Sequence, residues 1–141
     1  MNRAISAPVG KVFHAVAAIE QYPETFPSVT KVEFVGEQRE GVGTRFKETR
    51  LGSGRDGTSE VEVTEFVDGD HIQLKDESLG STWSTTYTVA DEGGVTRLTM
   101  AVEVEPRKLA AKLTLALGMS GYRKNMEKHL DAIKAHCEAA E

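Results

Sequence analysis

The end of the chain has the hydrophobic spacing of one long amphipathic helix. From Pro106 to Glu141 most residues are alanine, leucine, lysine, glutamate or methionine, which all favour helix. Apolar residues recur there at helical spacing: Leu109, Leu113, Leu115, Leu117, Met119, Tyr122, Met126, Leu130, Ile133 and Cys137. Gly118 and Gly121 interrupt the pattern and mark either a kink or the close approach of another backbone. Because such a helix must bury its apolar stripe, the rest of the chain is expected to form a sheet beneath it.

The beginning of the chain predicts a short strand, over residues 2–6, and two short helices. Pro8 suits the first turn of a helix. The next apolar residues share one helical stripe, which predicts a helix over residues 8–19: Val9, Val12, Phe13, Val16 and Ile19. Tyr22-Pro23 and Phe26-Pro27 bracket one further short turn of helix, since a residue before proline avoids the α region.

From Val29 to Glu105 the period of the apolar residues changes to two, which is typical of half-buried strands. The alternation predicts six further strands, separated by glycine-containing turns such as Gly41-Val42-Gly43, Asp68-Gly69 and Gly93-Gly94. Short turns make neighbouring strands antiparallel. We therefore expect one α+β domain over residues 1–141, with a seven-stranded antiparallel sheet, two short helices after the first strand and a long C-terminal helix.

Charge and cysteine content narrow the expected partners. The net charge is −5 with acids and bases interleaved, so nothing favours nucleic acid. No apolar run approaches the ~20 residues of a membrane span, and no apolar segment of a secretory signal follows Met1-Asn2-Arg3. The lone Cys137 excludes an internal disulfide and fits a reducing compartment. We expect a cytoplasmic protein without stable membrane insertion, either a monomer or a homodimer.

Two patterns in the sequence resemble cofactor or metal sites, and the context of each argues against that chemistry. Residues 52–57 match the dinucleotide pattern G-x-G-x-x-G, but a strand is predicted to follow where that pattern requires a helix. His129 and His136 are about 10 Å apart on the last helix and cannot ligate one ion by themselves. We therefore expect no cofactor and no metal site, and we expect these histidines to lie at the surface or at a rim.

Polar residues that share a strand face with apolar residues are the candidates for function. If Phe46 points inward, the period of two places Thr44, Glu48 and Arg50 on the same face. The same reasoning places Asp76 with Ile72 and Leu74, and it places Thr85 and Tyr87 with Trp83 and Val89. Buried charges are costly unless paired, so they are often retained for binding or catalysis. A bulge, or a position at an open mouth, is the alternative explanation.

Several of these segments resemble the START-like superfamily, and within it the bacterial polyketide cyclase/dehydrase and lipid-transport group. The resemblance spans essentially the whole chain and rests on Ile5-Ser6-Ala7-Pro8, Tyr22-Pro23, Gly43-Thr44-Arg45 and Thr96-Arg97-Leu98. It implies a helix-grip fold, in which a curved seven-stranded sheet wraps the C-terminal helix and leaves an elongated cavity between them. Relatives include aromatic polyketide cyclases, lipid and hormone carriers, and proteins that stimulate a chaperone ATPase, so the family alone selects no activity.

These observations lead to three hypotheses about function. The first is binding, as carriage or sequestration, of a hydrophobic or aromatic small molecule in a cavity of roughly 300–1,000 Å³. Its expected lining is Phe46, Glu48, Arg50, Trp83, Thr85, Tyr87, Met100, Met119 and Tyr122. The second is a cyclase/dehydrase-type enzyme for an enolisable aromatic or polyketide substrate, with Arg50 holding an enolate and Tyr87 or Glu48 moving a proton. The third, weaker hypothesis is a protein-interaction module without a ligand.

Overall fold

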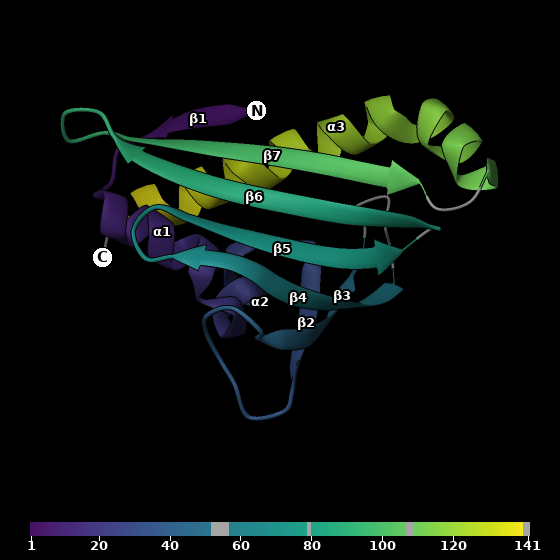
Figure 1. Cartoon of the computed structure of the whole chain (residues 1–141). Coiled ribbons are helices and arrows are strands. Elements are labelled where there is room, and N and C mark those ends of the chain that lie inside the picture. The colour runs from purple at the N-terminus through teal and green to yellow at the C-terminus, as the bar shows by residue number, and fades with distance from the viewer. Residues whose placement is uncertain (52–56, 79, 107–108, 140–141) are drawn as a thin grey trace.

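The computed structural model describes residues 1–51, 57–78, 80–106 and 109–139, with side chains except at residues 78 and 109–122. Its order of elements is the one that the sequence predicts (Figure 1). The elements are β1 (Asn2–Ile5), α1 (Val9–Ala17), the short 3-10 helix η1 (Ile19–Gln21), α2 (Tyr22–Thr25), β2 (Val29–Val35), β3 (Arg45–Arg50), β4 (Gly57–Val67), β5 (His71–Ser78), β6 (Ser81–Asp91), β7 (Thr96–Pro106) and α3 (Leu109–Glu138).

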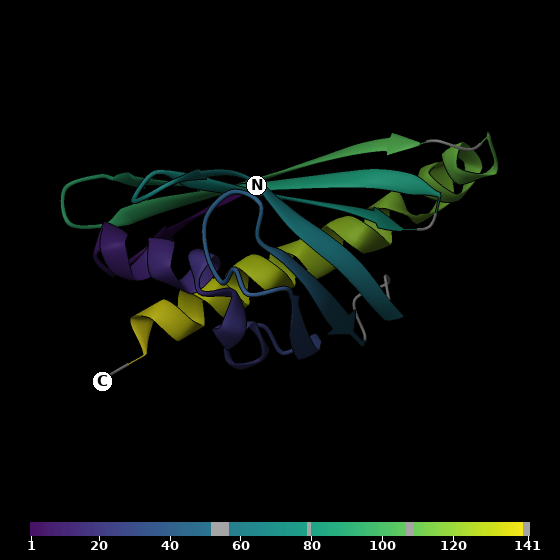
Figure 2. The same ribbon diagram turned by 60° about the horizontal axis from the view of Figure 1, so that its bottom comes forward.

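The strands form one seven-stranded antiparallel sheet with the order β1-β7-β6-β5-β4-β3-β2. Strands β2 to β7 are neighbours in sequence and in space, as short connections require, and β1 closes the far edge against β7. The sheet curves over α3, which runs diagonally beneath it, while α1 and α2 cover the other end of the same face (Figure 2). This is the helix-grip arrangement that the resemblance implied.

Strand β7 shows how the alternating pattern creates the concave face of the sheet. Its predicted inward face is buried at Leu98 and Met100 and half-buried at Val102 and Val104, whereas Glu103 on the other face is exposed. A register shifted by one residue would have turned every apolar side chain outward. The predicted face of β7 is therefore confirmed.

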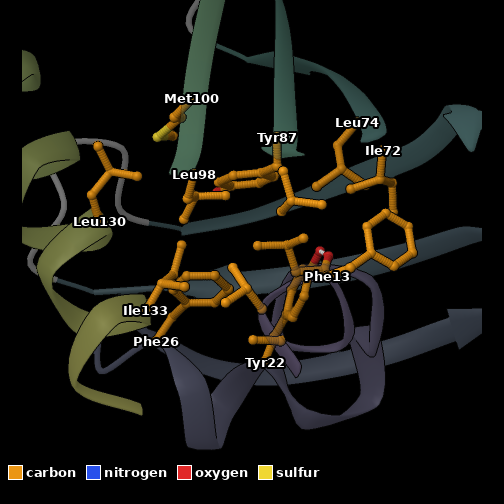
Figure 3. Close-up of a cluster of buried hydrophobic side chains, with 14 of the residues drawn as sticks. Phe13, Tyr22, Phe26, Ile72, Leu74, Tyr87, Leu98, Met100, Leu130 and Ile133 are labelled. Carbon is orange, nitrogen blue, oxygen red and sulfur yellow. Dashed lines mark hydrogen bonds between the residues drawn. The ribbon is translucent and has the colours of Figure 1, made fainter. Parts of the chain in front are cut away.

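The C-terminal half of α3 is fixed to the sheet and to β1. Leu130 and Ile133 are fully buried and face side chains of the sheet and of α2 (Figure 3). Lys134 Nζ donates a hydrogen bond of 2.6 Å to the carbonyl of Ala4, in β1. The helix continues without a break through the two glycines that interrupt its pattern. Among the described residues, no helix combines the length and the apolarity that crossing a membrane requires.

The first helix is shorter than the sequence predicts. Ala18 has a non-helical backbone conformation, with φ −80° and ψ 80°, which ends α1 before residues 19–21 form a 3-10 turn. Pro8 occupies the cap position in an extended conformation and not the first turn. The phenol of Tyr22 donates a hydrogen bond of 2.6 Å to the carbonyl of Val16, and this bond ties α2 to α1 across the interruption.

Candidate functional site

A partly enclosed cavity lies between the concave face of the sheet and α3. Among the described residues, its lining comprises Glu48 and Arg50 of β3, Val61 of β4, Leu74 and Asp76 of β5, Thr85 and Tyr87 of β6, Met100 of β7, and Met126 of α3. Its volume is about 30 Å³, which is room for about two water molecules. This part of the interior is far smaller than the predicted cavity, and the side chains of residues 109–122 lie outside the described part of the chain.

Two of the three charged residues in the described lining of the cavity form an ion pair on one strand. Arg50 Nε donates a hydrogen bond of 2.5 Å to Glu48 Oε1. The two residues are two positions apart in β3, so the pleat puts them on the same face. The side chain of Glu48 is 7% exposed and that of Arg50 is 18% exposed. Because separating two buried charges is unfavourable, each holds the other in the interior. The sequence-based placement of both residues on the inner face agrees with this geometry.

Two buried tyrosines add phenol groups to the same region. Tyr87 lines the cavity from β6, and Tyr22 reaches toward it from α2 (Figure 3). Burial raises the pKa of the Tyr22 phenol well above its usual value, and the nearby Tyr87 and Glu48 raise it further. Arg50 opposes this effect. Both the phenol of Tyr22 and the ion pair therefore belong to one electrostatic cluster.

His129 was predicted to lie at the surface or at a rim, and the structure shows that it is buried. It is 5% exposed, and its ring stacks on Phe26 with centroids 3.9 Å apart and an interplanar angle of 0°. Burial lowers the pKa of His129 to about 3, with a further contribution from the positive charge of Arg50. The signal for burial was present, because His129 lies three residues after Met126 and four before Ile133, which are both core residues. Its aromatic partner could not be read from the sequence.

Ser81 carries a buried hydroxyl group that has no hydrogen-bond partner among the described residues. The residue is fully buried at the start of β6, and its Oγ makes no hydrogen bond with any residue that the structure describes. Ser81 lies two positions before Trp83 and four positions before Thr85, so the three side chains share one face of the strand. Most buried hydroxyl groups find a partner, so this one is an unsatisfied polar group on the face that covers α3.

The structure brings together five of the nine side chains expected to contact a ligand: Glu48, Arg50, Thr85, Tyr87 and Met100. Phe46 is fully buried, but its described ring contacts are with Tyr22 and Phe34. Trp83 is buried in β6, beside Val104 of β7 in the pairing register, and it is not among the described lining residues. The expected positions Met119 and Tyr122 lie outside the described side chains. The role of all nine in ligand binding stays a prediction.

The sequence analysis missed three apolar lining residues, Val61, Leu74 and Met126. Each belongs to a predicted apolar stripe or strand face, but the pattern alone did not distinguish the cavity wall from the solid core. Asp76 was placed correctly on the inner face. Within the part of the chain that the structure describes, no three histidine, cysteine or carboxylate side chains are grouped closely enough to hold a metal ion.

The comparison with family models identifies the class of protein. Residues 1–138 match the family described as polyketide cyclase / dehydrase and lipid transport, so the chain belongs to this family. The match covers the sheet and essentially all of α3. No curated protein matches the sequence.

Solved structures with the same fold come from several kinds of protein. Ginseng major latex-like protein 151 from Panax ginseng is 15% identical with a TM-score of 0.78, and the alignment covers 99% of this chain and 95% of that chain. Truncated norcoclaurine synthase from Thalictrum flavum is 16% identical with a TM-score of 0.75, covering 100% and 92%. The di-domain ARO/CYC protein StfQ of the steffimycin pathway is 15% identical with a TM-score of 0.75, covering 98% and 50%. At these identities the likeness establishes the fold and no activity.

Proposed function

We propose that the chain binds, and so carries or sequesters, a hydrophobic or aromatic small molecule between the sheet and α3. The observation that carries this proposal is the Glu48–Arg50 ion pair, which lines this cavity and is largely withdrawn from solvent. A core built only for stability gains little from a buried pair, since well-packed apolar side chains serve as well. Groups of this kind are more often retained where a ligand must be oriented.

One further feature supports a ligand in this region. Met100 and Met126 line the described cavity from opposite sides. Methionine side chains adapt to irregular shapes, so these two walls can move apart more readily than branched residues. The expected ligand is therefore an aromatic or fused-ring molecule with an acidic or enolisable oxygen directed at Arg50.

A matched pair of probes tests this proposal. We expect 2-naphthoate and its neutral isostere 2-naphthamide both to bind and to change the fluorescence of Trp83, the only tryptophan. The variant Glu48→Gln/Arg50→Met removes both charges of the pair, and it is expected to weaken the binding of 2-naphthoate by about tenfold, because a hydrogen bond to a charged group is lost. The affinity for 2-naphthamide should change by less than about threefold. Equal losses of affinity for both probes would show that Arg50 does not contact the ligand.

A cyclase/dehydrase-type enzyme is the second candidate, because Arg50, Tyr87 and Glu48 converge on one cavity. In that reaction a base removes a proton from carbon, the electron pair moves to an oxygen held by Arg50, and a proton then returns. Exchange of the central CH₂ protons of benzoylacetone into deuterated buffer reports the first step. Exchange faster than in buffer alone, and lost in Glu48→Gln/Arg50→Met, would favour the enzyme. Exchange at the buffer rate would favour ligand binding without catalysis.

One observation supports the protein-interaction hypothesis. Phe46, Trp83, Met100 and Met126 are all buried, and the described part of the cavity is small. A solid interior would need no ligand. This alternative predicts that no apolar probe binds at all, which separates it from both of the other hypotheses.

A further inference from the structure

A second hollow lies on the other side of Met126, outside the cavity described above. It has a volume of about 330 Å³ and opens to solvent. Its described lining is Pro27, Ser28, Leu51, Asn125, Met126, Lys128, His129 and Ala132. Asn125, Lys128, His129 and Ala132 have the spacing of one face of α3. The opposite side consists of Pro27 and Ser28, between α2 and β2, and Leu51, directly after β3. We refer to these eight residues as the α3 groove.

His129 is the polar group built into the α3 groove. Phe26 covers one face of the imidazole and fixes its plane. Neither ring nitrogen forms a hydrogen bond with the described residues, although the residue is 5% exposed. The ring nitrogens are not among the fully buried unsatisfied atoms of the described residues, so they remain accessible from the groove. A ligand in the groove can therefore take the place of water as the hydrogen-bond partner of the imidazole.

The rest of the described lining selects the chemistry of that ligand. Leu51 is 60% exposed, and with Pro27 and Met126 it offers an apolar surface to a ring. Lys128 is the only charged residue among the described lining residues, so its charge is not opposed by a carboxylate there.

We propose that the α3 groove is a second binding site, for a small aromatic carboxylate. The ring lies on Leu51 and Met126, His129 donates a hydrogen bond to the carboxylate, and Lys128 supplies the opposite charge. The site is separate from the partly enclosed cavity, and Met126 forms a wall of both. Its existence does not depend on what the partly enclosed cavity binds.

Titration with 4-ethylbenzoate, followed by the imidazole C–H signals in proton–carbon NMR, tests the site. We expect a saturable shift of the His129 signal. Lys128→Met should weaken binding about threefold, as expected for an exposed charge. His129→Gln should weaken it about tenfold, because a hydrogen bond to a charged group is lost. The neutral 4-ethylbenzamide should bind more weakly, and Lys128→Met should leave its affinity unchanged.

Two controls make the outcome decisive. Lys124→Met removes an exposed lysine of the same helix that is not among the groove residues, and it should leave the affinity for 4-ethylbenzoate unchanged. An equal loss in Lys124→Met and Lys128→Met would show nonspecific attraction and overturn the proposal. A loss in Glu48→Gln/Arg50→Met with none in Lys128→Met would place the carboxylate in the partly enclosed cavity instead. The absence of any saturable shift at millimolar probe would also overturn it.

Discussion

Replacing Leu130 by alanine is expected to lower the free energy of unfolding by about 2–5 kcal/mol, the usual cost of truncating a buried leucine. Leu130 is fully buried on the stripe of α3 that packs against the sheet (Figure 3). The loss combines the transfer of the removed methyl groups with the hole left behind, which the surrounding core fills only in part. Urea denaturation measures the change, provided that its slope with denaturant is unchanged.

An exposed position on the same helix provides the control for this change. Glu127 is exposed, so Glu127→Ala should alter stability by less than about 0.5 kcal/mol. If Leu130→Ala were no more destabilising than Glu127→Ala, the C-terminal half of α3 would be peripheral to the core. The account of a sheet that folds around this helix would then be wrong.

Acid is expected to destabilise the protein through His129 as the pH falls below about 6.5. The folded state holds the pKa of His129 at about 3, whereas the unfolded chain has the ordinary value of 6.5. Between these two values the unfolded state binds a proton that the folded state does not, so stability is present above 6.5 and falls as the pH falls. Each pH unit in this window costs about 1.4 kcal/mol, which amounts to about 3 kcal/mol by about pH 4.

The variant His129→Gln isolates this effect, because glutamine does not titrate. The stability of the variant should therefore fall less steeply with pH in this window than that of the unchanged protein. The comparison uses the change with pH of each protein and not their absolute stabilities, since the substitution also disturbs the stack on Phe26. His71 acts in the opposite direction, because hydrogen bonds to Asp70 and Glu65 raise its pKa, but it is present in both proteins and cancels. Parallel pH profiles for the two proteins would show that His129 is not held neutral in the fold.

Most of the fold could be predicted because period and turn chemistry are local properties of the sequence. The alternation in β7 and the helical stripe around Leu130 are both visible in the printed sequence, and each fixes which side is buried. The glycine turns then leave few ways to arrange the strands. The end of α1 at Ala18 was missed, because the apolar stripe continues to Ile19 while the backbone changes to a 3-10 turn.

The candidate site could be predicted only in part. The face on which Glu48 and Arg50 lie follows from their spacing to Phe46, and the structure agrees. The stacking of His129 on Phe26 joins residues far apart in the sequence, so no local pattern contains it. The volume of a cavity depends on how side chains from six elements fit together, which a list of apolar residues does not determine. The cytoplasmic location and the oligomeric state stay predictions.

Native mass spectrometry of the freshly purified chain tests the central claim most directly, namely that the interior accepts a small molecule. We predict a species heavier than the chain by the mass of one small molecule, either co-purified or formed on addition of 2-naphthamide. This extra mass should be lost when the protein is unfolded by acid. The bare chain alone, with no complex at any concentration of 2-naphthamide or 2-naphthoate, would contradict the account and leave the protein-interaction hypothesis.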